Sequence, residues 1–146
     1  MFKELLAHLL APAPAPLNDE GARLALTALL VRIARSDHNY SEVEKDRIDR
    51  IICTRYGQDI GGAILLREQA EAMEAEAPDT VRFTRAIKEA VAYEDRIGVV
   101  EAMWQVVLAD GRRDQGEDAL MRLSANLLGV SDIDSAQARK RVETTV

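Results

Sequence analysis

The sequence predicts an all-α protein, folded as a single-domain bundle of about seven or eight helices. Apolar residues recur every three or four positions along most of the chain, which is the spacing of a helix with one buried face. No segment shows the sustained alternation of apolar and polar residues that a half-buried strand requires. At 146 residues, the chain can bury one core but is too short for two domains to be expected.

The N-terminal segment, residues 1–17, is expected to stand apart from a domain at 18–146. Its leucines recur at helical spacing and predict a short helix, and the Ala-Pro run at 11–16 predicts an extended linker. A signal peptide is the weaker interpretation because Glu4 and His8 interrupt an apolar stretch that is already short. No stretch is long enough to cross a membrane. We therefore expect a cytoplasmic protein that does not insert into membranes.

The domain itself is expected to contain seven helices, separated by helix-starting and helix-stopping residues. They are predicted at 18–36, 41–55, 60–77, 94–109 and 114–128, with a further helix that Asp79 caps and that carries Val81, Phe83, Ile87 and Val91, and a last helix after 131. The predicted N-caps are Ser41, Asp59, Asp79 and Ser131, and the predicted glycine stops are Gly57 and Gly129.

Composition excludes several classes of function. A net charge of −6 argues against a nucleic-acid-binding surface, which needs a concentrated basic face, and no block of Lys and Arg compensates locally. The single cysteine, Cys53, excludes an intramolecular disulfide and a cysteine-rich zinc site, and its apolar neighbours predict a buried thiol. Glu68, Glu71 and Glu74 lie three residues apart and predict a solvated helix face.

Two polar turns are similar to each other. They occur in "ARSDHNYSEVEKDRI", residues 34–48, and in "LADGRRDQGEDALM", residues 108–121. The apolar positions on either side of the two turns keep the same phase, which indicates two related helix–turn–helix halves. A shift of 73 residues places Asp37 on Asp110, Ser41 on Asp114 and Glu44 on Glu117.

These segments carry a family resemblance. "LLVRIARSD…YSEVEKDRI", together with "RIGVVEAMWQVVLADGRRDQGEDALMRLSANLLGVS", resembles the TerB-like family of tellurite-resistance-associated proteins over residues 20–142. The most specific elements are the two Asp-containing turns, each with a Glu seven residues on, and the closing "LLGVS". The resemblance implies an all-helical fold of two related halves and divalent-cation binding at the acidic turns. It also implies a link to tellurite and stress-response operons; similar domains occur attached to J-domain co-chaperones.

The resemblance also implies a set of metal ligands at the turns. Oxygen ligands of this kind favour Ca²⁺ or Mg²⁺ over zinc. Neither turn is an EF-hand, because position six of the first loop is Glu42 instead of Gly and position twelve is Ile48 instead of Glu. The candidate ligands are Asp37, Asn39 and Glu44 in the first turn, and Asp110, Asp114 and Glu117 in the second.

Helix capping is the competing explanation for part of this pattern. Ser41 followed three residues later by Glu44 is a capping box, and Asp114 with Glu117 can act similarly. Capping does not explain Asp37 and its counterpart, which follow helix C-termini where the helix dipole disfavours negative charge. A cation, an arginine partner or a backbone N–H could offset that charge.

Three functions are therefore compatible with the sequence. The first is a non-enzymatic module in tellurite or stress response that binds an unidentified protein partner, a divalent cation weakly, or both. The second is a metal-dependent hydrolase that uses the acidic turns, and the third is a purely structural bundle. The histidines, His8 and His38, have no metal-ligand partner at helical spacing and are expected to be ordinary surface residues.

Overall fold

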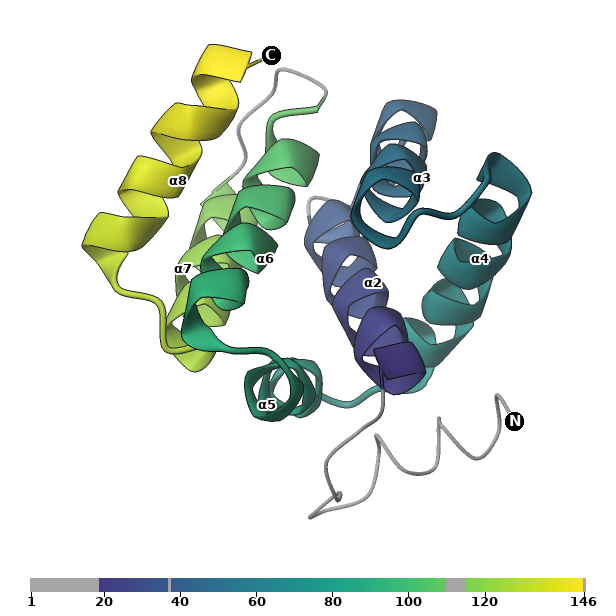
Figure 1. Ribbon diagram of the computed structural model, residues 1–146, viewed down its shortest axis with the longest axis horizontal. Coiled ribbons are helices and arrows are strands. Elements are labelled where there is room, and N and C mark those ends of the chain that lie inside the picture. The colour runs from purple at the N-terminus through teal and green to yellow at the C-terminus, as the bar shows by residue number, and fades with distance from the viewer. Residues whose placement is uncertain (1–18, 37, 110–114, 146) are drawn as a thin grey trace.

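The computed structural model describes residues 19–36, 38–109 and 115–145, which contain seven helices and no strand (Figure 1). The all-α prediction is thus confirmed for the described part of the chain. The predicted N-terminal helix and linker lie outside it. The helices are α2 (Asp19–Arg35), α3 (Glu42–Tyr56), α4 (Ile60–Glu76), α5 (Val81–Ala90), α6 (Tyr93–Val107), α7 (Gln115–Leu127) and α8 (Asp132–Thr145).

The helix order repeats at the spacing that the two polar turns share. A shift of 73 residues takes α2 to 92–108, where α6 spans Tyr93–Val107. The same shift takes α3 to 115–129, where α7 begins at Gln115, and the start of α4 to 133, where α8 begins at Asp132. Each half is therefore a triplet of helices, α2–α4 and α6–α8, and α5 connects them.

The core is built around α2 and α6, which lie between α8 on one side and α3 and α4 on the other (Figure 1). Burying each large aliphatic side chain contributes about 1.5–3 kcal/mol, so these two helices carry much of the stability. Among the described helices, none is both long and apolar enough to cross a lipid bilayer. The positions that match across the repeat are all fully buried: Leu30, Ile33 and Ala34 in α2, and Met103, Val106 and Val107 in α6.

Local signals set most helix ends. Gly57 ends α3 in the left-handed conformation, with φ of 64°, and the Asp59 side chain accepts a hydrogen bond from the Gly62 N–H at the start of α4. Ser131 likewise accepts from the N–H of Asp134 at 3.1 Å. The start of α5 differs from the prediction.

The N-cap of α5 is Thr80, which makes no capping hydrogen bond through its side chain. Asp79, the predicted cap, lies one residue earlier and accepts from the N–H of Arg82 at 3.3 Å. The carboxylate thus still satisfies a backbone donor of the first turn of α5, although the helix begins one residue later than its position suggests.

Candidate functional site

The first candidate site is the polar turn between α2 and α3, with its counterpart between α6 and α7. Asp37, Asp110 and Asp114 lie outside the described residues, and so does the side chain of Glu117. Within the described ranges, no three His, Cys, Asp or Glu side chains are grouped as metal ligands. Of the six candidate ligands, the structure thus describes the side chains of Asn39 and Glu44.

Glu44 forms the predicted capping box at the start of α3. Its N–H donates to Ser41 Oγ at 3.2 Å, and its carboxylate Oε1 accepts from the Ser41 N–H at 3.0 Å and from the Ser41 hydroxyl at 3.2 Å. The residue is fully buried, whereas Asn39 is exposed. Glu44 Oε1 therefore already accepts two hydrogen bonds within the cap, whereas the exposed Asn39 carries an amide oxygen of the kind that hard cations bind.

A buried ionic cluster lies behind this turn. Arg67 of α4 donates from Nε to Asp49 Oδ1 at 2.7 Å and from Nη1 to Glu71 Oε2 at 2.8 Å. The Tyr40 hydroxyl donates to the same Glu71 oxygen at 2.6 Å. Burial lowers the pKa of Arg67, but its hydrogen bonds with the two carboxylates outweigh that effect and hold the pKa above its ordinary value.

A second part of this cluster joins α2 to the end of α4. Glu74 accepts from Arg35 Nη1 at 2.6 Å and from Arg32 Nε at 2.9 Å, and the Arg32 Nη2 also donates to the backbone carbonyl of Ala77 at 2.8 Å. Glu74 is only 8% exposed. The prediction of a solvated Glu68–Glu71–Glu74 face is therefore wrong for the last two residues.

The reason for that error is that Glu74 and Glu71 have partners in distant parts of the sequence. Glu68 is exposed as expected, whereas Glu74 contacts arginines of α2 and Glu71 accepts a hydrogen bond from Tyr40. Arginines 39 and 42 residues before Glu74 in the sequence neutralise it, and a helical spacing pattern does not show such partners.

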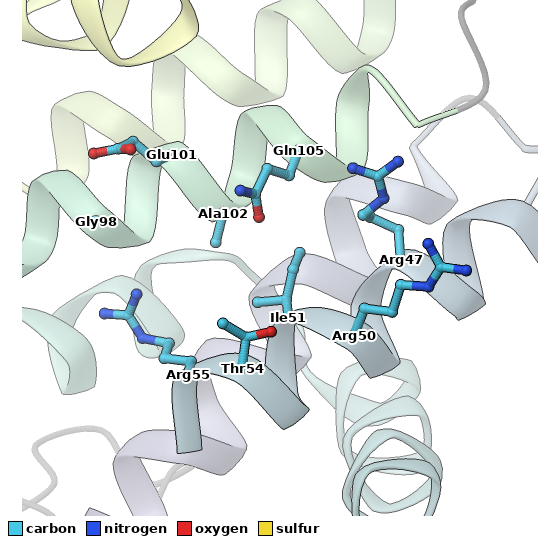
Figure 2. Close-up of a pocket in the computed structure, with 9 residues that line it drawn as sticks. All are labelled: Arg47, Arg50, Ile51, Thr54, Arg55, Gly98, Glu101, Ala102 and Gln105. Carbon is cyan, nitrogen blue, oxygen red and sulfur yellow. The ribbon is translucent and has the colours of Figure 1, made fainter. Parts of the chain in front are cut away.

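A second candidate site is a groove between α3 and α6 (Figure 2). Its volume is about 650 Å³. Arg47 and Arg50 lie at one end, opposite Gln105 of α6, and Arg55 lies at the other end, beside Gly98. The residues that line it are Arg47, Arg50, Ile51, Thr54 and Arg55 of α3, and Gly98, Glu101, Ala102 and Gln105 of α6.

The arginines of this groove are available to a ligand. Among the described residues, no carboxylate lies within ion-pair distance of Arg47, Arg50 or Arg55. Arg55 makes one long hydrogen bond, from Nη2 to the backbone carbonyl of Asp95 at 3.4 Å. Among the described residues that line the groove, the acidic one, Glu101, is paired with Arg141 of α8 at 3.4 Å.

This basic groove was not predicted from the sequence, because its arginines are not contiguous along the chain. The signal was present as a helical pattern: arginines at intervals of three and five residues along α3 lie on one side of the helix. The basic groove of an acidic protein is therefore made by one helix face and is not visible in the net charge.

Comparison with known proteins identifies the family of the chain. A family model described as "Tellurite resistance protein TerB" matches residues 23–140, which covers both helix triplets except their outermost ends. No curated protein and no solved structure matches the chain significantly. The match extends over much more than half of the chain, so this protein belongs to the TerB family of tellurite resistance proteins.

Proposed function

We propose that this TerB protein is a binding module and not an enzyme. It binds a divalent cation at its two polar turns and engages a protein partner through its helical surface, in tellurite or stress resistance. Family membership supports the tellurite-resistance context. The cation and the partner are our proposal.

The observation that carries the cation proposal is the parallel arrangement of α2 and α6. Their C-terminal ends lie on the same side of the bundle (Figure 1). Their N-terminal parts also line one cavity, which Ala22 and Leu26 of α2 share with Asp95 of α6. The two polar turns therefore follow helix ends that lie on the same side of the bundle.

The position of the turns also makes a cation favourable. Asp37 follows α2 by two residues and Asp110 follows α6 by three, at the negative ends of two helix dipoles. A cation would offset both the carboxylate charge and the partial charge of the helix ends. Aspartate and asparagine oxygens suit Ca²⁺ or Mg²⁺.

The chemistry of the described side chains supports binding over catalysis. Burial raises the pKa of Tyr40 and of Tyr56, and the Glu71 carboxylate raises that of Tyr40 further, so the pKa of each phenol moves away from the neutral range in which a general acid or base works best. The carboxylates of Asp49, Glu71 and Glu74 accept hydrogen bonds from arginines. Those bonds occupy the oxygens that a general base would need.

Calorimetry of metal-free protein titrated with Ca²⁺, Mg²⁺ and Mn²⁺ tests the cation proposal, with amide NMR shifts to locate the site. We expect saturable heat with at least one ion, and its loss in Asp37→Asn and Asp110→Asn. Asp46→Asn is the matched control, because Asp46 is an exposed carboxylate of α3 whose loss changes the charge equally. No saturable heat, or equal binding by all three variants, would refute the proposal.

The competing hydrolase function is tested separately, with generic phosphoesters and each metal ion. We expect no turnover above that of the metal alone. Metal-dependent turnover that disappears in Asp110→Asn but persists in Asp46→Asn would show an enzyme and overturn the binding-module proposal.

A further inference from the structure

We propose that the groove between α3 and α6 binds an acidic peptide segment of a protein partner, with Arg47, Arg50 and Arg55 as its carboxylate contacts. This inference deepens the partner-binding part of the proposed function and rests on it. It does not depend on cation binding at the turns.

The first argument for an acidic ligand is the positive charge of the groove. Three guanidinium groups lie along one side of α3, and the opposite wall offers the Gln105 amide (Figure 2). Arg47 and Arg50 are three residues apart on the helix, where like charges repel one another, and an anion bound in the groove would relieve that repulsion. The Glu101 charge is held by Arg141 at 3.4 Å and does not neutralise the three arginines.

The internal repeat shows that the fold does not require these arginines. A shift of 73 residues takes Arg47, Arg50 and Arg55 to three leucines of the second half. One of them, Leu123, is 50% exposed, so even a solvent-facing position of this helix accepts an apolar side chain. The three leucines are Leu120, Leu123 and Leu128. The three positions are thus basic in α3 and apolar at the matching places of the second half.

The spacing of the arginines selects the ligand. Arg47 and Arg55 are eight residues apart on one helix, which is about 12 Å along its axis. A single phosphate group is too small to contact both ends. An extended chain advances about 3.3 Å per residue, so side chains on alternate residues are about 6–7 Å apart and three acidic residues span the groove. Arginine recognises such carboxylates with two parallel hydrogen bonds.

The open wall beside Arg55 gives the peptide room. Gly98 has no side chain, and a Cβ added there would come within 3.4 Å of Arg55 Nη1. The absence of a side chain at this point of α6 leaves the arginine accessible from the groove. A nucleic acid is the less favoured ligand, because three arginines in a protein of net charge −6 provide few phosphate contacts.

The test uses the full chain and a fluorescein-labelled peptide of twelve residues with alternating Glu and Ala. A peptide in which Gln replaces Glu is the matched control probe, and binding is followed by fluorescence anisotropy. We expect saturable binding of the acidic peptide only, with an affinity that falls as NaCl rises because exposed charges are screened. Arg47→Gln/Arg50→Gln should weaken binding at least about fivefold, whereas Arg122→Gln on α7, outside the groove, should not.

A second variant tests occupation of the groove without changing any charge. Gly98→Leu fills the space beside Arg55 and improves the helix propensity of α6, so the protein should remain folded. We expect it to bind the peptide at least about fivefold more weakly, with an unchanged circular dichroism spectrum.

Three results would overturn this inference. They are equal binding of the Glu and Gln peptides, full binding by the double arginine variant, and tighter arginine-dependent binding of a single-stranded DNA 12-mer than of the peptide. The metal titration does not involve this groove, so a failed peptide titration with intact cation binding refutes the inference alone. Failed cation binding with intact peptide binding refutes only the cation part of the proposed function.

Discussion

The buried pair of Arg67 and Asp49 provides the most direct test of how the first half is held together. Arg67→Met keeps much of the length of the side chain but removes both of its charge-assisted hydrogen bonds, at 2.7 Å to Asp49 and 2.8 Å to Glu71. The two partners of the pair have side chains that are only 12% and 5% exposed, so water cannot replace the guanidinium. The Asp49 carboxylate would be left buried without its cation.

The burial of Arg67 and Asp49 determines how much free energy of unfolding this substitution should remove. Removing one partner of a buried ion pair typically costs about 3–5 kcal/mol, because it leaves an uncompensated charge. We expect about 3 kcal/mol for Arg67→Met, at the low end, since Glu71 keeps its hydrogen bond from Tyr40 and is partly exposed. For a chain of this size, that corresponds to a fall in Tm of about 6–12 °C.

Urea unfolding followed by circular dichroism measures this free energy. Lys45→Met is the matched control: its partner Glu42 is 84% exposed, so loss of that pair should cost less than about 0.5 kcal/mol. Asp49→Asn in the Arg67→Met background should recover part of the loss, because the buried charge is then removed. A loss below about 1 kcal/mol in Arg67→Met, or no recovery in the double variant, would refute the argument.

Two further predictions follow from single contacts. Because burial and the Glu71 carboxylate raise the pKa of Tyr40, the unfolded chain loses this proton near pH 10 while the folded protein keeps it. The free energy of unfolding should therefore decrease as pH rises above about 10. Tyr40→Phe should reduce that pH dependence, and at pH 7 it should cost about 1–2 kcal/mol for the lost hydrogen bond. Urea midpoints measured between pH 7 and 11 test both expectations. Gly57→Ala should destabilise by about 1 kcal/mol because φ is +64°, whereas Gly61→Ala, in the first turn of α4 with only ordinary contacts, should be neutral or stabilising in thermal melts.

The fold was predictable because its signals are local. Helix ends at Gly57 and Gly129 follow from the need for positive φ, and both glycines adopt it. The Ser41 cap and the phase of the buried positions likewise depend on residues only a few positions apart. The boundaries predicted at 18–36, 41–55, 60–77, 94–109 and 114–128 consequently agree with the structure to within about two residues.

The candidate sites were less predictable because they depend on contacts between helices. The sequence pattern predicted solvent exposure for Glu71 and Glu74, since the contacts of Glu74 with the arginines of α2 and of Glu71 with Tyr40 cannot be inferred from a single helical pattern. It also missed the α3–α6 groove, because the residues on its two walls are about fifty positions apart. The ligands proposed at Asp37 and Asp110 stay a prediction that the cation titration addresses.

The two halves of the repeat hold their helices together through different side-chain contacts. A shift of 73 residues takes Asp49 to Arg122 and Arg67 to Lys140, two basic residues, so the buried ion pair cannot exist in the second half. There, α6 and α8 are instead joined by Trp104, whose indole Nε1 donates to the carbonyl and hydroxyl oxygens of Ser135 at 3.2 Å each. The ionic cluster is therefore not a requirement of the helix triplet. Its consequence is local: it ties α4 to α2, to α3 and to Tyr40, the residue directly before the Ser41 cap of α3.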